Sequence, residues 1–142
     1  MSAAISHITF VVKDLDRMAD IVTGVLCGRE VYSSGEDTFS SSREKFFLVG
    51  DAWLAAMEGE PLPRRSYNHV AFKIEEAEFE TRLDAIKRLG LELKPPRPRV
   101  EGEGRSIYFY DDDNHLFELH TGTLEMRLES YARILEERRA AT

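Results

Sequence analysis

The chain of 142 residues is 42% hydrophobic and 32% charged, which are ordinary values for a globular protein long enough to bury a core within one domain. Its formal net charge of −7 argues against nucleic acid as the main partner, because the phosphate backbone selects basic surfaces. With a single cysteine an internal disulfide is excluded, and without a secretion signal or a long apolar run we expect a cytoplasmic protein with no membrane partner.

The first half of the chain predicts a strand, a helix and three further strands. Apolar residues recur at helical spacing from near Leu15 to Gly28, and Gly28 suits a left-handed helix end. Cys27, beside it, is expected to be a small buried apolar residue and not a nucleophile, and Trp53 is expected in the core. The expected strands lie at 6–13, 29–33, 45–49 and 53–57.

The second half repeats this order. Its helical pattern runs from near Ala77 to Gly90, and its expected strands lie at 68–74, 91–94, 106–110 and 115–120. Three landmarks match at one offset, because His7 and His69, Gly28 and Gly90, and Asp51 and Asp113 are each 62 residues apart. The pattern therefore predicts an α+β fold of two βαβββ modules in a single domain, 1–142. Module one spans about 5–58, module two about 67–121, and a C-terminal helix about 123–139.

The repeat brings potential metal ligands to matching positions. The first and last strands of the two modules contribute His7, Ala56, His69 and Glu118 at equivalent places. Two imidazoles and one carboxylate suit Mn²⁺, Fe²⁺ or Zn²⁺ and leave coordination positions open for substrate. A lone strand histidine is more often structural than a ligand, but the equivalence of His7 and His69 favours a metal site held by His7, His69 and Glu118.

Strand alternation indicates which neighbours share the metal face. Thr9 points the same way as His7, and His120 the same way as Glu118. Thr9 is a candidate substrate contact, although a β-branched residue is also ordinary in a strand. His120 is expected at the rim of the site, not among the ligands, and His115 is expected to be structural.

These residues resemble the vicinal oxygen chelate superfamily, which includes glyoxalase I, extradiol dioxygenases, bleomycin-binding proteins and fosfomycin-resistance enzymes. The nearest resemblance is to the hydrolytic FosX type of fosfomycin-resistance enzyme, and it covers nearly the whole chain. The segments that carry it are 6–10, 42–48, 67–72, 97–111 and 114–120, of which 97–111 is the most specific.

The resemblance implies an enzyme with one Mn²⁺ per active site that adds water to the epoxide of fosfomycin. It implies a homodimer in which paired modules come from different subunits, so that His7 serves a site completed by His69 and Glu118 of the other chain. It also implies that Glu44 is the base that activates water, because Glu44 matches the glutamate that distinguishes the hydrolytic branch. Without the resemblance, Glu44 is an ordinary charged residue at a strand entry.

Substrate contacts are likewise implied by the resemblance. Thiol-transferring relatives contact substrate at positions that match Tyr67, Ser106, Tyr108 and Arg127. Those relatives also have a loop lysine that contacts substrate. Four cations lie near that loop here, and Arg97 or Arg99 is our choice among Lys94, Arg97, Arg99 and Arg105.

Three other functions remain open at this stage. A thiol transferase acting on fosfomycin would share the metal site and differ only in the nucleophile. A glyoxalase or an Fe²⁺ dioxygenase could use the same ligands, and the physiological substrate could be another phosphonate. A non-catalytic drug-binding module, in contrast, would need no metal ligands.

Overall fold

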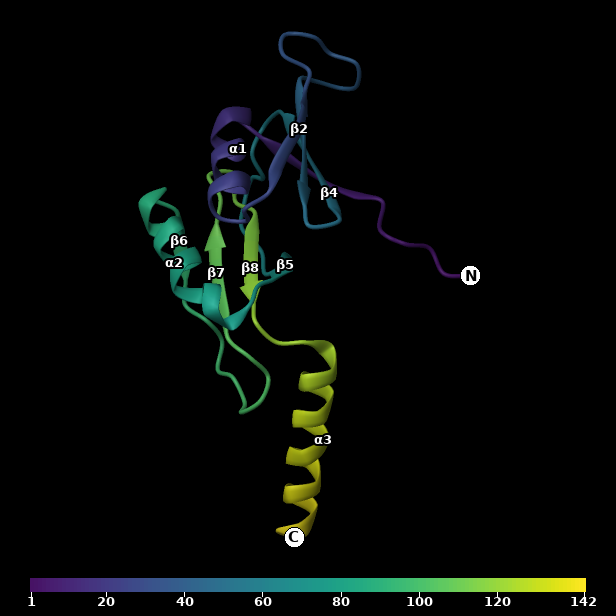
Figure 1. Cartoon of the computed structure of the whole chain (residues 1–142), viewed down its shortest axis with the longest axis vertical. Helices are drawn as coiled ribbons and strands as arrows, with labels where there is room; N and C mark the ends of the chain where they lie inside the picture. Colours follow the sequence, from purple (N-terminus) through teal and green to yellow (C-terminus); the bar gives the residue numbers. More distant parts are fainter.

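The computed structural model describes all residues, 1–142, and arranges its strands in two sheets of four (Figure 1). The strand order is β1-β4-β3-β2 in the first sheet and β5-β8-β7-β6 in the second, so the same topology occurs twice. The predicted pair of βαβββ modules followed by a C-terminal helix is confirmed. The elements are β1 (His7–Val12), α1 (Leu15–Gly24), β2 (Arg29–Ser33), β3 (Glu44–Val49), β4 (Ala52–Glu58), β5 (His69–Lys73), the 3-10 turn η1 (Glu76–Glu78), α2 (Phe79–Arg88), β6 (Glu92–Lys94), β7 (Ser106–Tyr110), β8 (Leu116–His120) and α3 (Leu124–Ala140).

The end of α1 differs from the prediction. Cys27, not Gly28, has the left-handed backbone conformation (φ 53°), and Cys27 is exposed, so the expectation that it is buried was wrong. Gly28 is required for a different reason. A Cβ atom at Gly28 would lie 2.8 Å from methyl groups of both Val22 and Val49, so only glycine allows the chain to pass this closely between helix and sheet.

One hydrophobic core serves both modules. It contains 19 buried residues from both sheets and both module helices, and the rings of Phe10 and Phe117 meet across the modules with centroids 5.1 Å apart. Because side chains alternate along a strand, each sheet turns one face toward this core and leaves the other face free. The free faces carry the residues predicted to form the site.

The C-terminal helix α3 extends away from the sheets (Figure 1). Thr123 caps its start by accepting the N–H of Met126. Its apolar stripe is largely exposed in one chain, with Leu124 at 67% and Leu128 at 58% of their full accessible surface. No helix of the structure combines the length and apolar character that a bilayer crossing requires.

The turn between β7 and β8 ties the second module to the first. Asp113 is buried, and its Oδ1 accepts the backbone N–H of Lys13, 2.9 Å away, at the end of β1. Arg17 donates to the neighbouring Asp112 (2.8 Å) and to the carbonyl of Leu89 (2.7 Å). This turn therefore fixes how the two modules sit against each other.

We expect Asp113→Ala to lower the free energy of unfolding by about 1–3 kcal/mol, because it leaves the Lys13 N–H without its acceptor. Asp113→Asn should cost less, since an amide oxygen can accept the same bond and burial raises the pKa of Asp113, which makes its charge unfavourable. Urea denaturation followed by circular dichroism measures both. The control is Asp112→Ala, which breaks a more exposed ion pair worth about 0–1 kcal/mol. Equal losses for Asp113→Ala and Asp112→Ala would contradict this role of the turn.

Candidate active site

The free face of the first sheet carries three of the predicted residues. His7 lies opposite Trp53 in the β1–β4 register, and Thr9 lies opposite Ala55. Glu44 begins β3 and lies opposite Met57, two positions along β4 from Ala55. His7, Thr9 and Glu44 therefore project from the same face of this sheet.

The second sheet repeats this arrangement with different side chains. Ala71, which is 62 residues after Thr9, lies opposite Glu118, whereas Thr9 lies opposite Ala55. The structural counterpart of Glu118 is therefore Ala55, and the expectation of Ala56 was wrong by one residue. The reason is the β7–β8 hairpin, which has one residue more than the β3–β4 hairpin. The position without a ligand is still an alanine.

His69 and Glu118 lie side by side and are the residues of this sheet that could hold a metal ion together. His69 Nε2 lies 3.0 Å from Glu118 Oε1, and His69 Nδ1 lies 2.7 Å from the carbonyl oxygen of Tyr67. A carbonyl can only accept, so Nδ1 carries a proton, and Nε2 is the ring nitrogen that faces the carboxylate. Two electron-rich atoms that face each other fit a cation between them, and borderline divalent metals suit one imidazole and one carboxylate.

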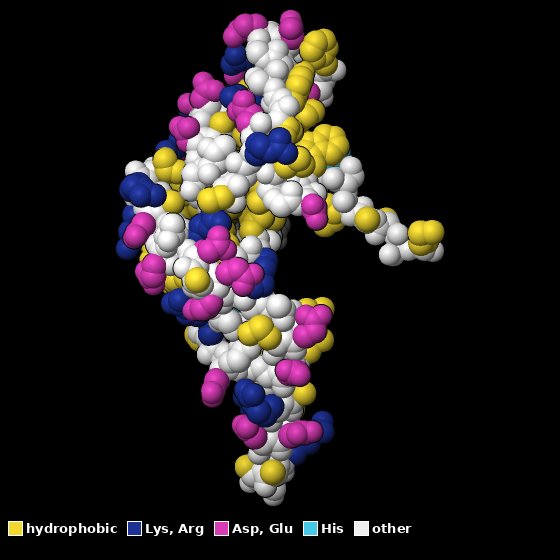
Figure 2. All heavy atoms as spheres, viewed as in Figure 1, with side chains coloured by type: hydrophobic (Ala, Val, Ile, Leu, Met, Phe, Trp, Pro, Cys, Tyr) yellow, Lys and Arg dark blue, Asp and Glu magenta, His cyan; other side chains and the backbone are white.

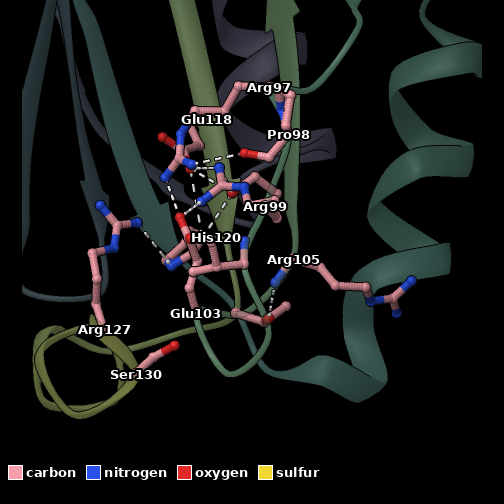
Figure 3. A network of polar contacts seen from close by, with 12 residues as sticks. Arg97, Pro98, Arg99, Glu103, Arg105, Glu118, His120, Arg127 and Ser130 are labelled. Atoms are coloured by element: carbon pink, nitrogen blue, oxygen red, sulfur yellow. Dashed lines mark hydrogen bonds and ion pairs between the residues drawn. The ribbon is translucent and has the colours of Figure 1, made fainter. Parts of the chain in front are cut away.

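The second oxygen of Glu118 is held by the protein. Oε2 accepts from Ser106 Oγ (2.5 Å) and from Arg99 Nη2 (3.1 Å), as Figure 3 shows for the arginine. Burial works to raise the pKa of Glu118, but the Ser106 hydrogen bond and the Arg99 charge outweigh it and hold that pKa below its usual value. Glu118 is thus ionised, and its Oε1 faces His69 Nε2.

His120 extends this network toward α3. Its Nδ1 lies 2.7 Å from Ser106 Oγ, and its Nε2 lies 3.5 Å from Arg127 Nη2 (Figure 3). Burial lowers the pKa of His120, and the charges of Arg99 and Arg127 add to this effect while Glu118 opposes it. A neutral His120 accepts a hydrogen bond from Arg127 at Nε2 and donates one from Nδ1 to Ser106. Arg127 therefore reaches the site through His120.

Two tyrosines line the same face beside His69 and Glu118. The hydroxyl oxygens of Tyr67 and Tyr108 are 3.3 Å apart, and the ring of Tyr108 packs edge-on against His69. Burial raises the pKa of Tyr108, and the hydrogen bond with Tyr67 adds to this, so the Tyr108 hydroxyl stays protonated and able to donate. Lys94 lies above the two rings, 5.3 Å from the centre of Tyr67.

His7 does not join His69 and Glu118 within one chain. Its ring stacks on Trp53 with centroids 4.3 Å apart, and its Nδ1 is hydrogen-bonded to Ser6 Oγ (3.0 Å). No group of three potential ligands comes together in the single chain. One chain thus holds the two parts of the predicted triad in separate places.

The comparisons with known proteins agree with this fold. A family model described as the Glyoxalase/Bleomycin resistance protein/Dioxygenase superfamily matches residues 4–119. Fosfomycin resistance protein FosX of Mesorhizobium japonicum is 61% identical over 96% of this chain and 98% of its own length. The chain belongs to the FosX family.

A FosX crystal structure and a more distant relative show how similar the chain is to two kinds of related protein. A FosX mutant from Listeria monocytogenes, complexed with Mn(II) and 1S,2S-dihydroxypropylphosphonic acid, has a TM-score of 0.83 and 52% identity over 92% of this chain and 99% of its own. Metallothiol transferase FosB of Staphylococcus saprophyticus is 35% identical over 92% of this chain and 85% of its own length. This member of the FosX family is therefore much more similar to FosX than to that transferase.

Two features of this FosX-family site escaped the sequence reasoning. Trp53 was expected in the core but is absent from the core cluster; it lies on the free face between His7 and Phe46, and its Nε1 is buried without a hydrogen-bond partner. Strand alternation counted from the expected Ala56 puts Trp53 on the opposite face, so only the one-residue shift to Ala55 reveals its position. The second feature is which loop cation enters the site, a choice that the sequence left open between two arginines. Of the two arginines we chose, Arg99 reaches Glu118 and Arg97 does not.

Proposed function

We propose that the chain is a Mn²⁺-dependent epoxide hydrolase that adds water to the oxirane of fosfomycin and so gives resistance to this antibiotic. The observation that carries the proposal is the pair of His69 and Glu118, arranged for a cation in a chain 52% identical to a FosX crystallised with Mn(II) and a dihydroxypropylphosphonic acid. That ligand carries two hydroxyl groups on adjacent carbons, which is what an epoxide becomes when it gains one water molecule.

The metal would be held by His7, His69 and Glu118. When bound, Mn²⁺ supplies a Lewis acid that stabilises the negative charge developing on the oxygen of the opening ring. Within one chain, His69 Nε2 and Glu118 Oε1 face each other, while Arg99 and Ser106 occupy the other carboxylate oxygen.

Glu44 is the proposed base that takes a proton from water. Its backbone is fixed on both sides by Ser34, whose Oγ accepts the Glu44 N–H (3.0 Å) and whose N–H donates to the Glu44 carbonyl (3.0 Å). The Glu44 carboxylate makes no hydrogen bond within the chain and belongs to a residue that is largely buried. A held backbone with a carboxylate free of partners suits a group that must accept a proton.

The phosphonate is proposed to bind to Thr9, Tyr67, Ser106, Tyr108 and Arg127. The hydroxyls of Tyr67 and Tyr108 can donate hydrogen bonds to anionic oxygens, and Arg127 adds positive charge from α3. Ser106 is already engaged, because its Oγ donates to Glu118 and lies within hydrogen-bond distance of both Arg99 and His120. Direct contact of Ser106 with substrate therefore requires one of these partners to move.

We further propose that the chain is a single domain that works as a homodimer, with each active site built from module one of one subunit and module two of the other. The separation of His7 from His69 and Glu118 within one chain supports this arrangement. The exposed apolar side chains Val11 on β1, Phe39 in the 34–43 loop, and Leu124 and Leu128 on α3 also support it. Figure 2 shows hydrophobic side chains on one face of the molecule.

Phosphorus NMR of fosfomycin incubated with the Mn²⁺-loaded protein and no thiol tests the activity. We expect the epoxide signal to give way to that of the diol, at a rate that added glutathione does not change. Turnover only in the presence of thiol would identify a transferase, and strict dependence on Fe²⁺ and oxygen would identify a dioxygenase. Tight binding of unchanged fosfomycin without any turnover would identify a drug-binding module.

A further inference from the structure

The loop between β6 and β7 contains a carboxylate with no exposed surface. Glu103 accepts hydrogen bonds from Arg97, from Arg99 Nη1 (3.0 Å) and from the backbone N–H of Val100 (3.1 Å). Burial works to raise the pKa of Glu103, but the Val100 N–H and the two guanidinium groups lower it to about 2. A buried charge is tolerated only when it is paired in this way, so Glu103 and its two arginines form one fixed unit.

The backbone around Glu103 is locked in place. Gly102 and Gly104 flank it with φ near +88° and +89°, a region that favours glycine. A Cβ at Gly104 would lie 2.6 Å from the backbone nitrogen of Gly122, so the loop presses directly on the segment that joins β8 to α3. From α3, the buried Ser130 donates to the carbonyl of Glu101.

Arg99 is the loop cation that enters the active site. Its Nη1 is held by Glu103, while its Nη2 reaches Ser106 Oγ (2.5 Å), Tyr108 Oη (3.0 Å) and Glu118 Oε2 (3.1 Å). Figure 3 shows Arg99 between Glu103 and Glu118. The Nε–H of Arg99 is buried without a partner. Arg105, in contrast, points away to Glu76 and the ring of Phe79.

We propose that Glu103 is a positioning residue that aims Arg99 at the phosphonate of the substrate. A free arginine side chain has many rotamers, and Glu103 restricts this one by accepting a hydrogen bond from its Nη1 at 3.0 Å, which leaves Nη2 as the nitrogen that enters the site. Nη2 then points at Ser106, Tyr108 and Glu118, the side chains that surround the proposed substrate. The identity of the ligand as a phosphonate rests on the proposed function; the positioning of Arg99 by Glu103 rests on their contacts.

Calorimetric titration of methylphosphonate into the Mn²⁺-loaded protein tests the proposal without requiring turnover. We expect Arg99→Ala and Glu103→Gln each to weaken binding by about 10- to 100-fold, the range for losing or misdirecting one charged hydrogen-bonding partner. Arg99→Lys, which keeps the charge but has no second nitrogen for Glu103, should weaken it by about tenfold. For fosfomycin turnover, these losses should appear mainly in KM and not in kcat.

The double variant separates positioning from simple support of the fold. If Glu103 acts through Arg99, Glu103→Gln combined with Arg99→Ala should bind methylphosphonate no more weakly than Arg99→Ala does. Arg105→Gln is the matched control, because Arg105 lies in the same loop but contacts Glu76 and Phe79 and not Glu103 or Glu118, and it should leave the affinity unchanged. Mn²⁺ affinity, measured by electron paramagnetic resonance, should stay within about twofold of the parent in Glu103→Gln, since Glu118 keeps Ser106.

Two results would overturn the proposal. One is parental methylphosphonate affinity in Arg99→Lys and Glu103→Gln, and the other is additive losses in the double variant. If Glu103→Gln fails to fold, parental affinity in Arg99→Lys alone rejects the proposal. Failure of the parent to hydrolyse fosfomycin would reject the proposed function, yet the methylphosphonate titration would still report on Glu103 and Arg99.

Discussion

Replacement of Glu44 by glutamine should reduce thiol-independent hydrolysis of fosfomycin by about 10²- to 10⁴-fold, the usual contribution of a positioned general base. Glutamine keeps the size of the side chain and leaves the two backbone contacts with Ser34 intact, so the strand should fold as before. The variant loses only the ability to take a proton from water. Mn²⁺ affinity should remain at the parent value, because Glu44 is not among the proposed ligands.

Phosphorus NMR of the reaction and electron paramagnetic resonance of the bound Mn²⁺ provide the two measurements. The control is Glu36→Gln in the neighbouring loop, which removes a carboxylate that is almost fully exposed and pairs only with Arg43. It should hydrolyse fosfomycin at the parent rate. Parental turnover in Glu44→Gln would mean that the water is activated by another group.

An active site built from two subunits predicts that two inactive variants recover activity when they are mixed. His7→Ala and Glu118→Gln should each lower activity by more than about 100-fold, since even the outer partners of metal ligands cost 10- to 100-fold when lost. When the two inactive variants are mixed, unfolded and refolded together, about a quarter of the parental activity should return. Half of the dimers are then mixed, and one of the two sites in each mixed dimer has all three ligands.

The matched control mixes His69→Ala with Glu118→Gln. These two residues contact each other within one chain, so every site in the mixed dimer lacks one of them and no activity should return. Recovery in this control, or no recovery with His7→Ala and Glu118→Gln, would contradict sites built from two subunits. Comparing the two mixtures separates the effect of building each site from two subunits from any effect of the substitutions on folding.

Much of the fold could be predicted because its signals are local and occur twice. Apolar spacing, turn residues and a common offset of 62 residues located both helices and all eight strands. Helix ends were less secure, as Cys27 illustrates. The backbone there turns left-handed one residue before the glycine, and Gly28 is required instead by its close packing between Val22 and Val49.

The candidate site was predictable only as far as alternation along a strand reaches. Alternation placed Thr9 with His7 and His120 with Glu118, as the registers also do. It could not detect the extra residue in the second hairpin, which shifted the counterpart of Glu118 from Ala56 to Ala55. Nor could it choose between Arg97 and Arg99. That choice depends on how a glycine-rich loop folds around Glu103, which is a matter of tertiary contacts.

The two sheets have the same topology, yet their free faces have diverged in complementary ways. Where the second sheet has Glu118 the first has Ala55, and where the first has Glu44 the second has Ser106. If each catalytic centre draws on both faces from different chains, an isolated protomer is inert. Specific activity should then fall on dilution below the dissociation constant of the pair, so that resistance would depend on how much of the protein a cell makes.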